Sequence, residues 1–308
     1  MGFKEWLSRL KLLSRVSGSS WCWGYDACPA VRGLVASIDG YSMGESLLPW
    51  MSLEDWGWKA TVAAAADVAA VGGRPLHVLY SIGVPSFEDA VKVASGVRDA
   101  AGWMGAKVGK SDLNRSRSGD GWIDVAVVGE AATPIGRGGA REGDVVIQAG
   151  YLGYGAVEYV ALQGLVSVSS IPEPILRYTR RPTPPISLGP YISLCRAHAA
   201  SDNSDGWAAT LASIAVESGV SIKIERLEAP LDVIQALKSL NVDLDEMLLS
   251  SWEDYNMAII APPDSAKCIL KACSRLGYFC KVVGFVESGE PSVYYKDAKV
   301  EPRGWVSI

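Results

Sequence analysis

One carboxylate, Asp67, lies in a stretch of sequence that is otherwise almost wholly apolar and helix-forming. Residues 60–71 consist of alanine, valine, one threonine and this aspartate. The residues three and four positions away on a helix are alanines and a valine, and none of their side chains donates a hydrogen bond. Because an unpaired ionised carboxylate is costly to bury, such groups pair, bind a metal ion or take up a proton. Asp67 therefore either faces water near the helix end or meets a partner from outside the helix.

The composition is globular and carries no nucleic-acid or membrane signature. The chain has 308 residues, a net charge of -5 and a pI of about 5.2, and its basic residues are scattered. Charges interrupt the apolar N-terminal run, which excludes a secretory signal core. No apolar run approaches the roughly 20 residues that cross a bilayer. We expect a cytoplasmic protein that binds neither nucleic acid nor membranes.

Helical and strand patterns alternate along the chain, which predicts an α/β fold. A strand is predicted over 34–38, with a turn at Asp39 and Gly40. Ser52 opens a helix that passes through Asp67 and ends at the glycines of 72–73. Further strands are predicted over 76–84, 122–128, 145–149, 221–224, 257–261 and 279–286, with helices after Ser86, Gly155 and Gly206 and near 231 and 264. The glycine-rich segment 136–144 predicts a junction between domains 1–143 and 144–308.

Cysteines, histidines and glycine motifs give weaker signals. The six cysteines are too irregularly spaced to predict a disulfide scaffold or zinc site, so we expect most to be small core residues. His77 and His198 are predicted to be structural. The segment 105–111 resembles a phosphate-binding P-loop but has three residues between its glycines where four are needed. The segment 150–155 lacks the dinucleotide spacing and is predicted to be a tight turn from strand to helix.

Aspartates recur at the predicted strand ends and turns. They are Asp26, Asp39, Asp67, Asp112, Asp202 and Asp205. Any one of them is compatible with a turn or a cap. Together they indicate hard-cation chemistry, because Mg²⁺ prefers oxygen ligands and is usually held by few carboxylates plus substrate phosphates. Without a P-loop, this set predicts a nucleotide site built on metal bridges.

At these positions the sequence resembles the thiamine-monophosphate kinase family, within the aminoimidazole ribonucleotide synthetase-like superfamily. The resemblance covers nearly the whole chain. Gly24-Tyr25-Asp26-Ala27 resembles the family's GDDA, and Ser37-Ile38-Asp39 resembles its TTD. The segments 54–60, 66–75, 138–144, 204–206, 253–255 and 304–305 are similar to the family's EDIGWKA, SDLAAMGARP, RSGARPGD, SDGL, GGEDY and GWxHF.

The resemblance implies a two-domain α/β (α+β) fold of the aminoimidazole ribonucleotide synthetase type. It implies that two N-terminal domains form a homodimer through a shared β-barrel, that the C-terminal domain is α/β, and that ATP and Mg²⁺ are used to phosphorylate thiamine monophosphate. The implied metal ligands are Asp26, Asp39, Asp67, Asp112 and Asp202, and the implied nucleotide residues are Asp26, Lys59, Asp112 and Asn114. Ser204 and Asp205 match the catalytic turn, while Asp205 and Trp305 match acceptor positions. Lys59 is alternatively an exposed helical lysine.

Several residues depart from the family pattern. Tyr25 replaces the first aspartate of GDDA, and 41–47 lacks the glutamate, histidine and phenylalanine of LVEGVHF. Ser251 and Trp252 stand in place of two glycines, and 306–308 lacks the terminal His-Phe. Three readings follow. The chain is a thiamine-monophosphate kinase, a related ATP-dependent enzyme with another small acceptor, or a non-catalytic nucleotide-binding homologue.

Overall fold

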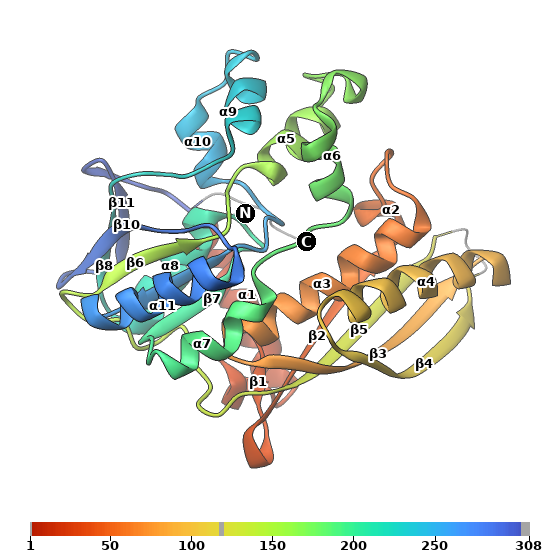
Figure 1. Cartoon of the computed structure of the whole chain (residues 1–308), viewed down its shortest axis with the longest axis horizontal. Coiled ribbons are helices and arrows are strands. Elements are labelled where there is room, and N and C mark those ends of the chain that lie inside the picture. The colour runs from red at the N-terminus through yellow and green to blue at the C-terminus, as the bar shows by residue number, and fades with distance from the viewer. Residues whose placement is uncertain (1, 117–119, 303–308) are drawn as a thin grey trace.

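The chain folds into two α/β units, each built on one mixed sheet (Figure 1). The computed structural model describes residues 2–116 and 120–302. The first unit holds a five-stranded sheet and the second a seven-stranded sheet. Within the described residues, no helix is long and apolar enough to cross a bilayer.

The first sheet has the strand order β1-β2-β5-β3-β4. Its strands are β1 (Cys28–Pro29), β2 (Leu34–Ser42), β3 (Arg74–Val84), β4 (Lys107–Arg115) and β5 (Trp122–Glu130). β3 and β4 are parallel, and the other pairs are antiparallel. Helices α3 (Leu53–Ala70) and α4 (Phe87–Trp103) cover one face of this sheet, and α2 (Met43–Ser46) follows β2 (Figure 1).

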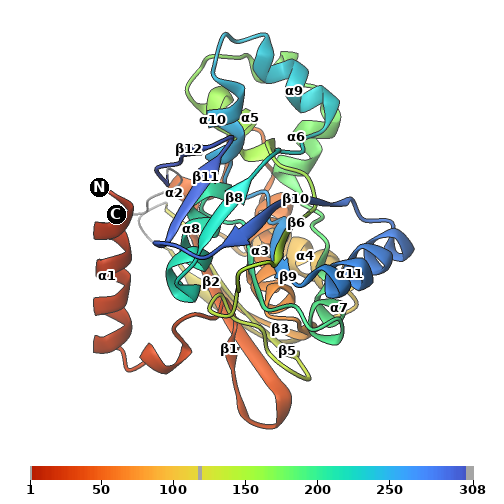
Figure 2. The same cartoon turned by 90° about the vertical axis from the view of Figure 1, so that its left-hand side faces the viewer.

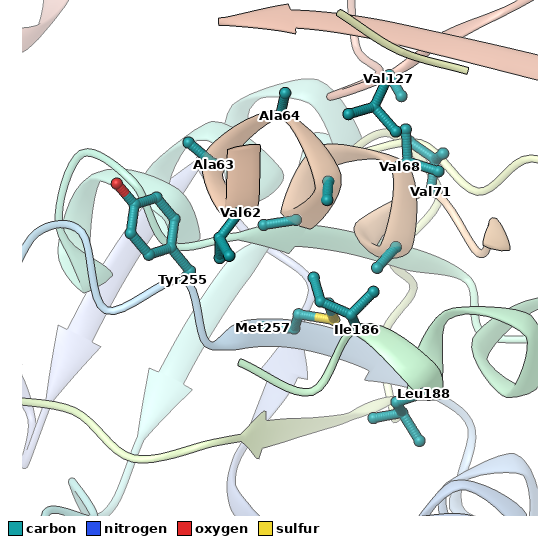
Figure 3. Packing of buried hydrophobic residues seen from close by; sticks show 14 of the residues in the cluster. Val62, Ala63, Ala64, Val68, Val71, Val127, Ile186, Leu188, Tyr255 and Met257 are labelled. Carbon is teal, nitrogen blue, oxygen red and sulfur yellow. The ribbon is translucent and has the colours of Figure 1, made fainter. Parts of the chain in front are cut away.

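The helix that carries Asp67, α3, lies between the two sheets. A capping box of Ser52 and Asp55 starts the helix. Gly57 lets α4 approach, because a Cβ there would lie 2.2 Å from the Val93 carbonyl oxygen. Figure 3 shows α3 with Val127 of the first sheet on one side and Met257 of the second on the other. A helix buried all round needs apolar residues all round, which explains its alanine-rich sequence.

The second sheet has the order β12-β11-β8-β10-β6-β9-β7. Its strands are β6 (Val145–Ala149), β7 (Ala199–Asp202), β8 (Ser221–Ile224), β9 (Met257–Ala261), β10 (Cys280–Glu287), β11 (Ser292–Tyr295) and β12 (Ala298–Lys299). Only β8 and β11 pair in parallel among the ladders of this sheet in the described residues.

The helices of the second unit are short, except for two. They are α5 (Tyr154–Leu162), α6 (Glu173–Arg180), α7 (Gly189–Leu194), α8 (Trp207–Ser218), α9 (Leu231–Lys238), α10 (Leu244–Leu249) and α11 (Pro263–Leu276). An N-terminal helix, α1 (Phe3–Val16), runs along one edge of the molecule (Figure 2).

Most predicted elements are confirmed, and the predicted turn at Asp39 is wrong. β2 continues to Ser42, because Asp39 and Gly40 pair with Val125 and Asp124 of β5. The P-loop-like segment lies mostly in edge strand β4, where the ladder with β3 shifts register around Gly109. The predicted turn at 150–155 is confirmed, with α5 starting after Gly153, whose φ is +103°. The domain boundary at 143/144 stays a prediction.

The expectation for the cysteines was also wrong. All six are paired, as Cys22–Cys28, Cys195–Cys268 and Cys273–Cys280, with Cα separations of 5.2, 5.7 and 6.1 Å. These separations lie in the usual range for disulfides. Two of the pairs fix α11, one to Cys195, which directly follows α7, and one to β10. Irregular sequence spacing did not predict them because the partners meet only in the folded sheet-and-helix layers.

Neither histidine belongs to a group of acidic, histidine or cysteine side chains that could hold a metal ion among the described residues. The Nδ1 atom of His198 lies 2.8 Å from an Asp144 carboxylate oxygen, so its predicted structural role is confirmed. His77 is exposed on β3.

Candidate active site

An acidic cavity of about 210 Å³ opens where α3 meets the end of β7 and the start of α8. It gathers residues from both units and from α1. The lining residues are Trp6, Tyr25, Asp26, Asp67, Arg137, Ser201, Asp202, Ser204, Asp205, Ala209, Thr210 and Ser213. Five residues of the predicted site are therefore brought together here, namely Asp26, Asp67, Asp202, Ser204 and Asp205.

Asp67 meets a partner from outside its helix. The Ser37 hydroxyl of β2 donates a hydrogen bond to the Asp67 carboxylate. Burial raises the pKa of Asp67 well above its usual range, and the nearby carboxylates of Asp39, Asp202 and Asp26 raise it further. Asp67 is half-buried and lines the cavity, so of the two interpretations the structure supports a partner from outside the helix.

Asp26 is held by the segment between α1 and β1. One of its oxygens accepts a hydrogen bond from the Ser201 hydroxyl at 3.2 Å, and the other accepts one from the Asp202 amide at 3.3 Å. Arg137 Nη1 lies 3.6 Å from Asp26 Oδ1. Burial raises the pKa of Asp26, and these three partners partly offset that rise.

Asp202 ends β7, and Asp205 lies in the turn before α8. Gly206 closes this turn with a φ of +114°, which favours glycine, and its amide donates to Asn203 Oδ1 at 3.1 Å. Asn203 is fully buried and donates to Asn256 Oδ1 at 2.9 Å. Burial raises the pKa of Asp205 to about 6. The turn therefore presents an acidic side chain to the cavity from a rigid base.

Asp39 lies on β2 beside the cavity and belongs to the same electrostatic group. Burial, together with the charges of Asp205 and Glu253, raises its pKa to about 7. Burial also raises the pKa of Asp202 well above normal, with further contributions from Asp26 and Asp39. All five carboxylates thus have pKa values raised mainly by burial, and Arg137 supplies the only cationic side chain among the lining residues described here.

The donors of this group are hard oxygens, which suit Mg²⁺. In the described part of the chain, however, no three acidic, histidine or cysteine side chains converge as a preformed ligand shell. A cation bound here would therefore need oxygens from a ligand or from water in addition to protein carboxylates.

Lys59 is not the exposed helical lysine of the alternative interpretation. It is 1% exposed, and its Nζ lies 2.5 Å from Glu253 and 3.2 Å from Glu158. Burial opposes its charge, yet these two carboxylates raise its pKa above normal. Lys59 is thus occupied by protein carboxylates and does not line the cavity. Its predicted contact with nucleotide stays untested.

Asp112 and Asn114 lie apart from the cavity. Both are exposed on edge strand β4, where Asn114 donates to Asp112 Oδ2 at 2.9 Å and Ser81 donates to the same oxygen at 3.3 Å. The registers align Asp112 with Ser81, Asp124 and Gly40 across the sheet. Three strand spacings therefore separate Asp112 from β2, or about 14 Å. Their roles stay predictions, and Trp305 lies outside the described residues.

Sequence reasoning missed several lining residues. Arg137 was read only as part of a glycine-rich junction, and Trp6 only as part of a charged N-terminal run. Ser201, Thr210 and Ser213 surround the predicted aspartates and carried no separate signal. The spacing of Ser213, two turns into α8, could have placed it near Asp205.

The chain has the two domains of an AIR synthase related protein. A family model described as the AIR synthase related protein N-terminal domain matches residues 25–131, and one described as the C-terminal domain matches residues 141–296. The two matches lie over the first and second sheets.

Relatives within that class are more specific. The chain is 30% identical to the thiamine-monophosphate kinase of Pyrobaculum calidifontis over 275 residues, which cover 89% of this chain and 87% of the relative. The chain belongs to the thiamine-monophosphate kinase family.

Solved structures agree with that assignment. A complex described as AaThiL with AMPPCP and TMP superposes with a TM-score of 0.84 at 27% identity and covers 97% of this chain and 96% of its own. The thiamine monophosphate kinase of Aquifex aeolicus superposes with a TM-score of 0.81 at 26% identity, covering 95% and 96%.

Proposed function

We propose that this chain transfers the terminal phosphoryl group of ATP to thiamine monophosphate, giving thiamine diphosphate and ADP. The observation that carries the proposal is the acidic cavity, in which Asp26, Asp67, Asp202 and Asp205 converge with Arg137. Family membership supplies the substrate class, since the relatives are thiamine-monophosphate kinases and one solved relative binds AMPPCP and TMP.

The carboxylates would hold Mg²⁺ together with phosphate oxygens. Asp26, Asp39, Asp67 and Asp202 are the proposed ligands, and Asp112 is a further proposed ligand on the exposed sheet. Bound Mg²⁺ would neutralise the charge of two polyanionic substrates and orient them in line. The raised pKa values of Asp39, Asp67 and Asp202 support the proposal, because a divalent cation relieves the repulsion that causes part of each of these rises.

Arg137 is proposed to contact the transferred phosphoryl group. Its Nε is buried and has no hydrogen-bond partner among the described atoms, although its Nη1 approaches Asp26. A guanidinium with a free donor offers an anionic oxygen a charge-assisted hydrogen bond. Ser204 and Asp205 lie on the same turn and are proposed to orient the reacting phosphates.

We propose a homodimer formed through the uncovered face of the first sheet. Helices α3 and α4 cover only one face of that sheet, and within the described residues the sheet is open (Figure 1). Large apolar side chains are exposed on its strands, among them Leu34, Ile38, Val108 and Leu113. Exposed apolar patches of this kind mark association surfaces. Such a dimer would also bring a partner's surface to Asp112 and Asn114, and ATP use fits the predicted cytoplasmic location.

Product analysis tests the proposal. The wild-type protein, Mg²⁺ and ATP are incubated with thiamine monophosphate, thiamine and other small phosphorylated acceptors, and ADP and phosphorylated products are quantified by chromatography. We expect equimolar ADP and thiamine diphosphate from thiamine monophosphate alone. Turnover of another acceptor instead would favour the related enzyme, a reading that Tyr25 in the cavity wall motivates. Binding of ATP without any turnover would favour the non-catalytic homologue.

A further inference from the structure

Helix α1 brings an aromatic side chain to the acidic cavity. Trp6 is partly buried and lines the cavity, together with Tyr25 from the segment before β1. Phe3 stacks on Trp6 with ring centroids 5.7 Å apart and is itself packed against the core of the second unit. The Trp6 ring is therefore supported from the side of the helix N-terminus.

The second half of α1 is held by charges and an aromatic ring. Lys11 Nζ lies 3.8 Å from Glu217 on α8 and 5.2 Å from the centroid of the Trp23 ring. Trp23 Nε1 donates to the same Glu217 carboxylate at 2.6 Å. The guanidinium carbon of Arg137, a residue of the cavity wall, lies 6.0 Å from the centroid of the same Trp23 ring. These contacts fix α1 beside the cavity, along the edge of the molecule seen in Figure 2.

The apolar face of α1 is half-buried. Phe3, Leu7 and Leu10 share this face with Trp6, whereas Leu12 and Leu13 lie outside it and are 62% and 64% exposed. Among the described residues of α1, Trp6 is the one that lines the acidic cavity. The docking of α1 therefore places an indole ring where a ligand in the cavity would meet it.

We infer that Trp6 forms part of the acceptor-binding wall, so that α1 is a component of the substrate site and a determinant of acceptor specificity. This inference rests on the proposed function. An indole face attracts a planar cation by stacking and by its quadrupole, and the surrounding carboxylates add a negative potential. The acceptor that fits is a molecule with a cationic aromatic ring and a phosphate group. Its ring would contact Trp6, and its phosphate would lie near Arg137 and the proposed Mg²⁺ ligands.

Calorimetry on three variants tests the inference. Trp6→Ala removes the ring, Trp6→Phe keeps a smaller ring, and Trp21→Ala is the matched control, since Trp21 is 68% exposed and does not line the cavity. Thiamine monophosphate and Mg²⁺ with AMPPCP are titrated separately into each full-length protein. Trp6→Ala should raise the Kd for thiamine monophosphate about tenfold and Trp6→Phe only a few fold, because indole-cation contacts are worth about one factor of ten. Trp21→Ala should match wild type, and AMPPCP affinity should stay within about twofold in all variants.

The possible results distinguish a failure of the role of Trp6 from a failure of the proposed function. Unchanged thiamine monophosphate affinity in Trp6→Ala, with tight binding by wild type, overturns the role of Trp6 and leaves the proposed function standing. Equal losses of affinity for thiamine monophosphate and AMPPCP, with a lowered Tm, also overturn the role of Trp6, because Trp6 would then be a packing residue. Should Trp6→Ala fail to fold, Trp6→Phe decides by the same ratio of the two Kd values. A wild-type protein that binds no thiamine monophosphate overturns the proposed function itself, and this inference with it.

Discussion

Lys59 Nζ lies 2.5 Å from Glu253 Oε2, so the central helix of the first unit is ion-paired with a loop of the second. Glu253 also accepts hydrogen bonds from the hydroxyls of Tyr41 at 2.9 Å and Tyr255 at 3.1 Å. Glu253 and Tyr255 both have positive φ, of 50° and 49°. Such backbone costs about 1 to 3 kcal/mol per residue and persists where surroundings hold it. Between them, Asp254 accepts the Gly153 and Gly155 amides at the start of α5. Lys59 thus fixes a strained loop at the domain interface.

Replacing Lys59 should destabilise the whole fold. Lys59→Met leaves Glu158 and Glu253 buried without their cation, and breaking one partner of a buried pair costs about 3 to 5 kcal/mol. Urea unfolding at pH 8 measures this. Lys92→Met is the control, because Lys92 is an exposed lysine on α4 and should change stability by no more than about 0.5 kcal/mol. A Lys59→Met protein as stable as the control would show that the buried ion pair is dispensable.

Glu158 should make stability depend on pH. Burial is the largest effect on Glu158 and raises its pKa from 4.5 to about 7, although Lys59 opposes the rise. The folded state therefore binds this proton more tightly than the unfolded state. The stability linked to that proton is fully present below about pH 4.5 and is lost as the pH rises through about 7. Glu158→Gln keeps an acceptor for Lys59 and cannot ionise.

The difference between the two unfolding free energies isolates this group. Between about pH 4.5 and pH 7, the free energy of unfolding of Glu158→Gln should increase relative to wild type by at most about 1.4 kcal/mol per pH unit. Unfolding midpoints in urea at half-unit pH steps provide the comparison. Parallel curves for the two proteins would refute the assignment. Carboxylates that lie away from Glu158, Lys59 and Glu253 contribute equally to both proteins and cancel.

Asp67→Asn should weaken metal-dependent nucleotide binding and leave the fold intact. The amide keeps the volume and the acceptor for Ser37 but loses the charge, so the Kd for AMPPCP in Mg²⁺ should rise by about tenfold or more. Because the substitution removes one of several repelling carboxylates, stability without Mg²⁺ at pH 8 should not fall. Asp264→Asn, at a side chain 94% exposed, is the control. Unchanged affinity in a folded Asp67→Asn protein would make Asp67 purely structural.

The two disulfides of α11 should differ in their contribution to stability. Cys195–Cys268 closes a loop with a sequence separation of 73, and Cys273–Cys280 closes one of 7. Chain entropy alone assigns about 4 kcal/mol to the long loop and about 2.5 kcal/mol to the short one. Paired alanine substitutions at each site, compared by urea unfolding, should show that order. Detection of free thiols in the denatured, unreduced protein would contradict the pairing.

Strand and helix positions were largely predictable because local patterns specify them. Alternation and caps located 145–149, 221–224 and 257–261, which match β6, β8 and β9. The turn expected at Asp39 failed because pairing with β5 overrides the local preference of Asp-Gly. The disulfides failed for a similar reason, since their partners are brought together only by tertiary packing.

The site was predictable where residue type is unusual for its surroundings. Asp67 was predicted as a site residue because it is the one charged residue in an otherwise apolar helical segment. A carboxylate in such a segment needs a polar environment, which the cavity provides. Lys59 lies on the same helix but looked ordinary, because lysine favours helices and its two carboxylate partners come from distant segments. The role of Trp6 was not predictable either, since the sequence of a charged amphipathic helix does not indicate which cavity the helix will border.

Thiamine diphosphate formation by wild type and by Asp205→Asn tests the central claim most directly. Both proteins are assayed with saturating ATP, Mg²⁺ and thiamine monophosphate, after circular dichroism has established equal folding. We expect steady formation of thiamine diphosphate by wild type and a loss of about 100-fold or more in kcat for Asp205→Asn, comparable to removing one preorganised polar group from a reaction centre. Absence of product from wild type, or full activity in the folded variant, would contradict the assignment of catalysis to the acidic cavity.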